Sequence, residues 1–219
     1  MTKIAITGTG RCGTTFLVRI FTFVGLDTGF SPNQLIQASV YLGYSSGPLQ
    51  ARENYEEILD ADVSIEPCGN ADPLNGNIGL ETNLSTDTYT QQVIKSPFFM
   101  QQAVALVKSH GVKVFIVPLR DFKEVVDSRE ARQGYKGGPW LLGVQDYENL
   151  VGGFDNTIQQ LKKDNYDVSV IYLNFYKMIE SKLYLYNKLE NVLKKYGVKK
   201  DIFFQAYDAA TSLWEPGFF

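Results

Sequence analysis

The sequence predicts a single α/β domain with three layers, in which a parallel sheet of about four or five strands lies between helices. Apolar runs of four to seven residues alternate with helical patterns, as in repeated strand–helix–strand units. The 219 residues suffice for one substantial core. A glycine-rich loop follows the first apolar run directly, as expected at the edge of a parallel sheet.

The first elements are predicted from the N-terminal third of the chain. Residues 3–7 form the first expected strand, and TTFLVRIFTFVG predicts a helix that ends near Gly25. LDTGF, at 26–30, reads as a short second strand. Between 31 and 90, Pro, Gly and Asn are frequent and only RENYEEIL looks helical, so we expect an irregular insertion or cap within a single domain spanning 1–219.

Regular patterns return after this segment. The elements expected there are a strand over 91–96, a helix over 97–110, a buried strand over 112–119, a helix over 121–132, a helix over about 146–163, a strand over 167–174 and a final helix over about 181–196. Asp121 is the expected N-cap of its helix. In the final helix, Tyr186, Leu189, Leu193 and Tyr196 fall on one stripe, which indicates core packing.

The composition argues against a membrane protein, a disulfide-rich protein and a histidine-based metal site. Hydrophobic residues make up 44% and charged residues 21%, which is typical of a globular protein, and no apolar run approaches the roughly 20 residues of a membrane span. Two cysteines provide no disulfide framework, and one histidine makes a histidine-based metal site improbable. We expect a cytoplasmic protein whose partners include no membrane.

Charge is distributed unevenly along the chain. Residues 26–90 contain ten acidic residues and one basic residue, a balance of −9, so the remainder carries +6 given the net charge of −3. A basic scaffold favours a polyanionic small ligand, whereas the acidic segment favours a neutral or cationic acceptor. The pattern argues against a broad nucleic-acid surface.

The stretch GTGRCGTTFL, at 8–17, has the outline of a phosphate-binding loop. Gly8 and Gly13 match its two glycines, but Thr14 stands where a triphosphate-binding loop has lysine. Backbone amides and the positive end of the following helix still favour an anion. The cation is Arg11, before the second glycine, and no apolar strand ends in an aspartate suited to magnesium, which weakens the case for triphosphate chemistry.

GRCGTTFL resembles the 5′-phosphosulfate loop of sulfotransferases that use 3′-phosphoadenosine 5′-phosphosulfate (PAPS). In that family a basic residue stands at the position of Arg11. The family also has an arginine at the end of a buried strand and a serine eight residues later, matched by Arg120 and Ser128 in LRDFKEVVDSR. In VIKSP, Lys95 ends a strand ahead of a helix, as a lysine does in several branches.

The resemblance implies a P-loop-type fold that transfers a sulfuryl group from PAPS to a hydroxyl or amine without a metal. The residues that would hold PAPS, or its product adenosine 3′,5′-bisphosphate, are Gly10, Arg11, Cys12, Gly13, Thr14, Thr15, Arg120 and Ser128. Arg11 and Lys95 would act catalytically, because fixed cations stabilise the charge that spreads over the sulfuryl oxygens in the transition state.

The general base does not follow from the family pattern. Pro97 stands where one branch has a histidine, and Ser31 stands where another has a glutamate. His110 is expected at a helix C-terminus beside Gly111, on the face of the sheet away from the donor. Glu81, shortly before the Lys95 strand, is the first candidate base, ahead of other acids of the insertion.

Two other functions remain open from the sequence. One is a P-loop nucleotide or small-molecule kinase with a degenerate loop, and the other is a non-catalytic nucleotide-binding protein. For a sulfotransferase, we expect a neutral or cationic small-molecule or glycan acceptor.

Overall fold

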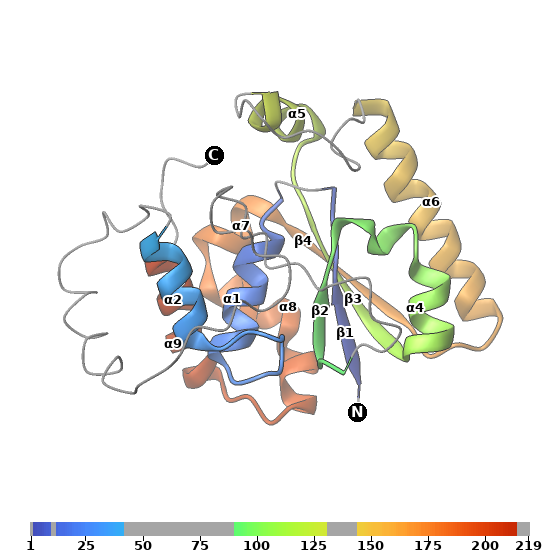
Figure 1. The fold of residues 1–219 in the computed structure, drawn as a ribbon. Coiled ribbons are helices and arrows are strands. Elements are labelled where there is room, and N and C mark those ends of the chain that lie inside the picture. Colours follow the sequence, from blue (N-terminus) through green and yellow to red (C-terminus); the bar gives the residue numbers. More distant parts are fainter. Residues whose placement is uncertain (1, 10–11, 42–89, 131–143, 214–219) are drawn as a thin grey trace.

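The computed structural model describes residues 2–9, 12–41, 90–130 and 144–213, with the side chains of 37–41, 128–130 and 144 outside the description. A parallel sheet with strand order β2-β1-β3-β4 forms the middle layer (Figure 1). Its strands are β1 (Lys3–Ile6), β2 (Val93–Lys95), β3 (Val112–Leu119) and β4 (Ser169–Asn174).

Helices cover both faces of this sheet. They are α1 (Thr14–Phe23), α2 (Pro32–Tyr41), the short 3₁₀ helix η2 (Pro97–Met100), α4 (Ala103–His110), α5 (Phe122–Glu130), α6 (Val144–Lys163), α7 (Phe175–Glu180), α8 (Lys182–Lys195) and α9 (Lys200–Ser212). In Figure 1, α1, α8 and α9 lie on one side of the sheet, α4 and α6 lie on the other, and α5 lies beyond the strand ends. The expected α/β class with helices on both faces is therefore confirmed.

The alternation of side chains along β1 explains why two cores form. Ile4 and Ile6 are buried in the cluster shared with α1, α8 and α9, whereas Ala5 is buried in the opposite cluster with α4 and α6. Neighbouring strands follow the same rule, with Ile116 on the α1 side and Phe115 on the other. Both faces of the sheet are therefore apolar, as in other parallel sheets covered by helices.

The strand register brings four strand ends to one edge of the sheet. Ile6 pairs with Lys95 of β2 and with Ile116 of β3, and Leu119 of β3 pairs with Asn174 of β4. Because all pairs are parallel, the segments that follow the strands begin at the same edge. This carboxyl edge carries the residues considered below.

Several elements match their predicted bounds closely. The strand expected over 112–119 is β3, and the helix expected over about 146–163 is α6. The side chain of Asp121 accepts a hydrogen bond from the amide of Glu124 at 3.2 Å, which confirms the predicted cap. His110 ends α4, and Gly111 follows it with a φ of 70°, so the predicted helix terminus is confirmed.

Other predicted elements differ from the structure. No strand forms over 26–30; this segment instead follows α1 beyond Gly25, whose φ is 86°. The helix expected over 97–110 begins as η2, with the Ser96 hydroxyl accepting from the Phe98 amide, and continues as α4 only from Ala103. Helix α2 lies where only irregular structure was expected, and α9 follows the helix taken to be the last.

In the described part of the chain, no helix combines the length and apolar character that crossing a membrane requires.

Candidate functional site at the carboxyl edge

The loop between β1 and α1 starts at the centre of the carboxyl edge. The Thr7 amide donates to the Ile116 carbonyl at 3.1 Å, so β1 stays attached to β3 up to the first residue of the loop. Gly13, with a φ of 86°, precedes Thr14, the first residue of α1. Gly10 and Arg11 lie outside the described residues, so the predicted roles of these two remain predictions.

Side chains pack closely against both glycines of the loop. A Cβ atom on Gly8 would collide with the Sγ atom of Cys12, which is fully buried. A Cβ atom on Gly13 would lie 2.5 Å from Cε of Met178 and 3.1 Å from the ring of Phe175. The loop conformation therefore depends on the absence of side chains at both positions.

Helix α1 directs its N-terminus toward this loop. The first intrahelical bond joins the Leu17 amide to the Gly13 carbonyl at 3.3 Å. The amides of the first turn carry the positive end of the helix dipole, and Gly13 has no side chain with which to cap them. This geometry suits an anion.

Lys95 brings a buried cation to the same helix terminus. It is the last residue of β2, and only 4% of it is exposed. Its Nζ atom donates to Oγ1 of Thr15 in the first turn of α1, at 3.4 Å. The structure thus brings together two of the predicted site residues, which are 80 positions apart in sequence. A lysine is rarely buried without a function for its charge.

The hydroxyl of Thr7 is a polar group that sequence reasoning did not single out. Thr7 is fully buried directly before the loop, and its Oγ1 atom has no hydrogen-bond partner in the described structure. Buried hydroxyls normally have one, so this group is available to a water molecule or a ligand atom.

Arg120 lies at the same edge, immediately after β3. Its side chain is 6% exposed, and the guanidinium carbon lies 4.8 Å from the centre of the Phe175 ring. The Phe175 ring also lies against Gly13, so it contacts both the loop and the arginine. Arg120 is therefore held by a stacking contact that an arginine makes better than a lysine.

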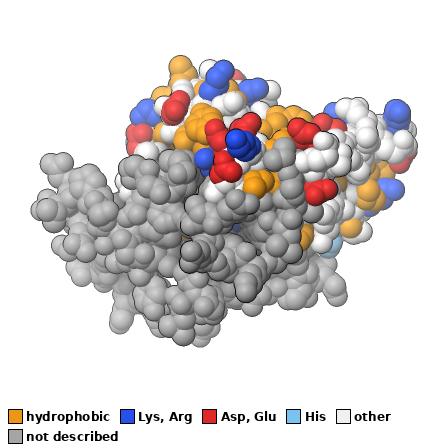
Figure 2. Space-filling model, turned by 90° about the horizontal axis from the view of Figure 1, so that it is seen from above, with side chains coloured by type: hydrophobic (Ala, Val, Ile, Leu, Met, Phe, Trp, Pro, Cys, Tyr) orange, Lys and Arg blue, Asp and Glu red, His pale blue; other side chains and the backbone are white. Residues whose placement is uncertain are grey.

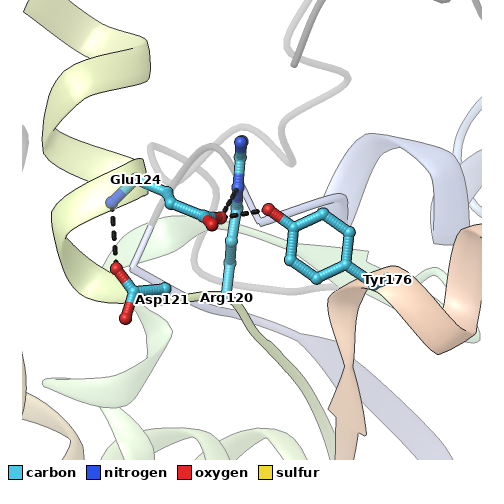
Figure 3. A network of polar contacts seen from close by, with 4 residues as sticks. All are labelled: Arg120, Asp121, Glu124 and Tyr176. Atoms are coloured by element: carbon cyan, nitrogen blue, oxygen red, sulfur yellow. Dashed lines mark hydrogen bonds and ion pairs between the residues drawn. The ribbon is translucent and has the colours of Figure 1, made fainter.

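Two side chains that were not predicted complete this part of the site (Figure 3). The Nε atom of Arg120 donates to Oε2 of Glu124 at 3.1 Å, and the hydroxyl of Tyr176 donates to the same oxygen. Figure 3 shows Glu124 reaching the cluster from α5 and Tyr176 from α7, with Asp121, directly before α5, bound to the Glu124 amide. The hydrogen bond to Glu124 raises the pKa of Tyr176 above its usual value, while Arg120 acts in the opposite direction.

The remaining predicted residues are less fully described. Ser128 lies on α5, and its side chain is not described. Eight residues of helix span about 12 Å, which places its backbone well beyond Arg120. Glu81 lies outside the described residues, so its role as a base remains a prediction. Thr14 is buried at the start of α1, next to the partly buried Thr15.

Charged side chains gather on this edge of the molecule. Figure 2 looks down onto it and shows acidic and basic side chains beside one another, with apolar side chains around them. Among the described residues, no group of three or more His, Cys, Asp or Glu side chains is placed to hold a metal ion. The guanidinium of Arg120 is paired at this edge with the carboxylate of Glu124.

Part of the unpredicted cluster could have been found from the sequence. Arg120 and Glu124 are four residues apart, which is the spacing of an ion pair on a helix. Tyr176 gives no such signal, because it reaches Glu124 from an element 52 residues away.

The chain was compared with protein-family models and with curated protein sequences. Neither the protein-family models nor the curated protein sequences gave a match to this chain.

Proposed function

We propose that this protein is a PAPS-dependent sulfotransferase built on a three-layer fold of the P-loop type. The observation that carries the proposal is the contact between Lys95 Nζ and Thr15 Oγ1. It places a buried cation at the N-terminus of α1, beside the loop that resembles a 5′-phosphosulfate loop. A triphosphate loop would instead have its lysine within the loop, where this chain has Thr14.

The reaction requires fixed positive charge at the loop. An acceptor oxygen or nitrogen attacks sulfur, the bond from sulfur to the 5′-phosphate oxygen breaks, and its electron pair stays on that phosphate. The leaving phosphate gains charge in the transition state, which Lys95 and the hydroxyl of Thr15 would stabilise together with Arg11. The acceptor proton passes to a base, for which Glu81 is our candidate.

The product adenosine 3′,5′-bisphosphate has two separate phosphates and needs two anion-binding elements. The loop and the start of α1 would bind the 5′-phosphate. Arg120 would bind the 3′-phosphate, with Ser128 as a second contact. Support for this assignment comes from the restrained position of Arg120, which is buried against Phe175 at the same edge as the loop.

The acceptor is expected to be a neutral or cationic small molecule or glycan. The segment 26–90 has a balance of −9, which would repel an acceptor that is already sulfated. A hydroxyl is the preferred acceptor group, with an amine as the alternative.

Calorimetry and a transfer assay test the proposal together. We expect adenosine 3′,5′-bisphosphate to bind in the presence of EDTA, and ATP with Mg²⁺ to bind much more weakly. We also expect ³⁵S from labelled PAPS to appear in a product when pools of neutral and basic acceptors are supplied. Tighter binding of ATP with Mg²⁺ would instead indicate a kinase. Tight bisphosphate binding without transfer to any pool would indicate a nucleotide-binding protein.

A further inference from the structure

Arg120 and Tyr176 donate hydrogen bonds to one and the same atom, Oε2 of Glu124 (Figure 3). A guanidinium from the end of β3 and a phenol from α7 therefore converge on a single acceptor oxygen. Phosphate oxygens accept the same hydrogen bonds as carboxylate oxygens and carry more charge. The carboxylate of Glu124 thus occupies a position that suits an external oxyanion.

The three side chains differ in how firmly they are held. Arg120 is 6% exposed and stacks on Phe175, whereas the side chain of Glu124 is 42% exposed. The ring of Tyr176 also packs edge-on against Phe175, with the ring centres 5.2 Å apart. Glu124 is therefore the partner that can turn toward water, and the buried guanidinium that it leaves then needs another anion in its place.

We propose that Glu124 is a displaceable internal ligand of an oxyanion site formed by Arg120 and Tyr176. In this site, the Tyr176 hydroxyl binds the 3′-phosphate of the nucleotide in place of Glu124. The inference rests on the proposed function and deepens it, since it adds Tyr176 to the phosphate contacts and gives the site a means of selection. A phosphate dianion displaces the carboxylate, whereas a weaker acceptor does not.

The exchange breaks no covalent bond and requires only a side-chain rotation. The phenol is protonated at neutral pH, since the usual pKa of tyrosine is 10.0 and the hydrogen bond to Glu124 raises the pKa of Tyr176 further. Tyr176 can thus redirect its hydrogen from the carboxylate to a phosphate oxygen. When Glu124 turns outward, its charge also moves away from the bound phosphate, which reduces the repulsion between them.

Isothermal titration calorimetry on the full chain separates the roles of the two residues. The probes are adenosine 3′,5′-bisphosphate and adenosine 5′-monophosphate, which lacks the 3′-phosphate. For Tyr176→Phe we expect bisphosphate affinity to fall about tenfold, the usual effect of losing a hydrogen bond to a charged group, while monophosphate affinity is unchanged. For Glu124→Gln we expect bisphosphate affinity to rise about threefold, because the competing charge is removed.

Matched substitutions elsewhere serve as controls. Tyr166 has the same 37% exposure as Tyr176, and Glu190 pairs with Lys194 on α8. Tyr166→Phe and Glu190→Gln should therefore leave both affinities unchanged. Melting temperatures of all four variants report whether each remains folded.

The results can contradict the inference in two ways. Weaker bisphosphate binding by Glu124→Gln would mean that Glu124 orients Arg120 instead of competing for it. An unchanged affinity of Tyr176→Phe for the bisphosphate would mean that Tyr176 does not contact the 3′-phosphate. Both results leave the wild-type preference for the bisphosphate over the monophosphate intact. Loss of that preference in the wild type would overturn the proposed donor itself, together with this inference.

Discussion

The Cε atom of Met178 lies 2.5 Å from the position that a Cβ atom on Gly13 would occupy. Met178 belongs to α7, which follows the last strand, whereas Gly13 ends the loop after the first strand. The segments that follow β1 and β4 therefore meet at the proposed phosphate loop. Replacing Gly13 with alanine adds a single methyl group at this position and so tests the contact.

Gly13→Ala should destabilise the fold more than Gly197→Ala. Both glycines have a positive φ, which costs an alanine about 1–2 kcal/mol, but only Gly13 faces other side chains within 4 Å. Overpacking against Met178 should add about 1–3 kcal/mol to the loss of unfolding free energy. Urea denaturation of both variants measures the difference. Equal losses would show that Met178 moves aside freely, and a double-mutant cycle with Met178→Ala isolates the pairwise energy.

Lys95→Met should slow sulfuryl transfer about 10²- to 10³-fold while the fold survives. Methionine fills a similar volume without the buried charge, and bisphosphate affinity should change much less than the rate, because the charge that Lys95 neutralises develops in the transition state. Turnover of labelled PAPS, calorimetry and the melting temperature check this expectation. Lys113→Met is the control, since Lys113 is 49% exposed and pairs with Asp167 away from the loop. Normal turnover by the Lys95 variant would exclude it from catalysis.

Arg120→Lys should weaken binding of adenosine 3′,5′-bisphosphate about tenfold and leave adenosine 5′-monophosphate binding unchanged. Lysine keeps the charge beside Glu124 but loses the planar donor group and the stacking on Phe175. Calorimetry with the two nucleotides measures the contribution of the 3′-phosphate. Equal losses for both nucleotides would assign Arg120 a structural role.

Arg11→Ala should abolish transfer and leave the melting temperature unchanged. This expectation rests on the position of Arg11 in the sequence GRCGTTFL alone. Turnover of labelled PAPS at the wild-type rate would contradict the sulfotransferase assignment.

Tyr207 should make stability fall at alkaline pH. Burial raises its pKa to about 12, from the usual value of 10, and its hydroxyl donates to the carbonyls of Met178 and Ile179. Because the unfolded chain loses this proton first, the stabilising contribution is complete below pH 10 and is lost as the pH rises toward 12. Urea denaturation at pH 9 and pH 11 should show a smaller loss in Tyr207→Phe than in the wild type. The two proteins share every other tyrosine, so a difference of zero would exclude Tyr207 from the effect.

Most of the strands and helices could be predicted from the sequence, because the spacing of apolar residues along the chain is a local signal. VKVFIVPL is buried on both faces and could be read directly as β3. Helix α9 also has a local signal, since its buried residues follow helical spacing; they are Phe203, Ala206, Tyr207 and Ala210. PNQLIQASVY lacks charged residues and has a weaker pattern, so the assignment of α2 depends on tertiary packing.

The site was predictable where it depends on strand ends and not where it depends on contacts between distant elements. The parallel arrangement alone places Lys95 and Arg120 at the edge that holds the loop. The close fit of Phe175 and Met178 against Gly13, and the reach of Tyr176 to Glu124, depend on how α7 lies after β4. No spacing rule in the sequence encodes that orientation.

Tyr207 connects the last described helix to both sides of the proposed phosphate loop. Its hydroxyl holds the backbone of α7, while its ring packs edge-on against Phe16 of α1, with the ring centres 5.4 Å apart. Opening of α9 would therefore release two helices that shape the anion site. By thermodynamic linkage, a bound nucleotide should slow amide hydrogen exchange in α9, even though none of its residues is assigned a contact with the ligand.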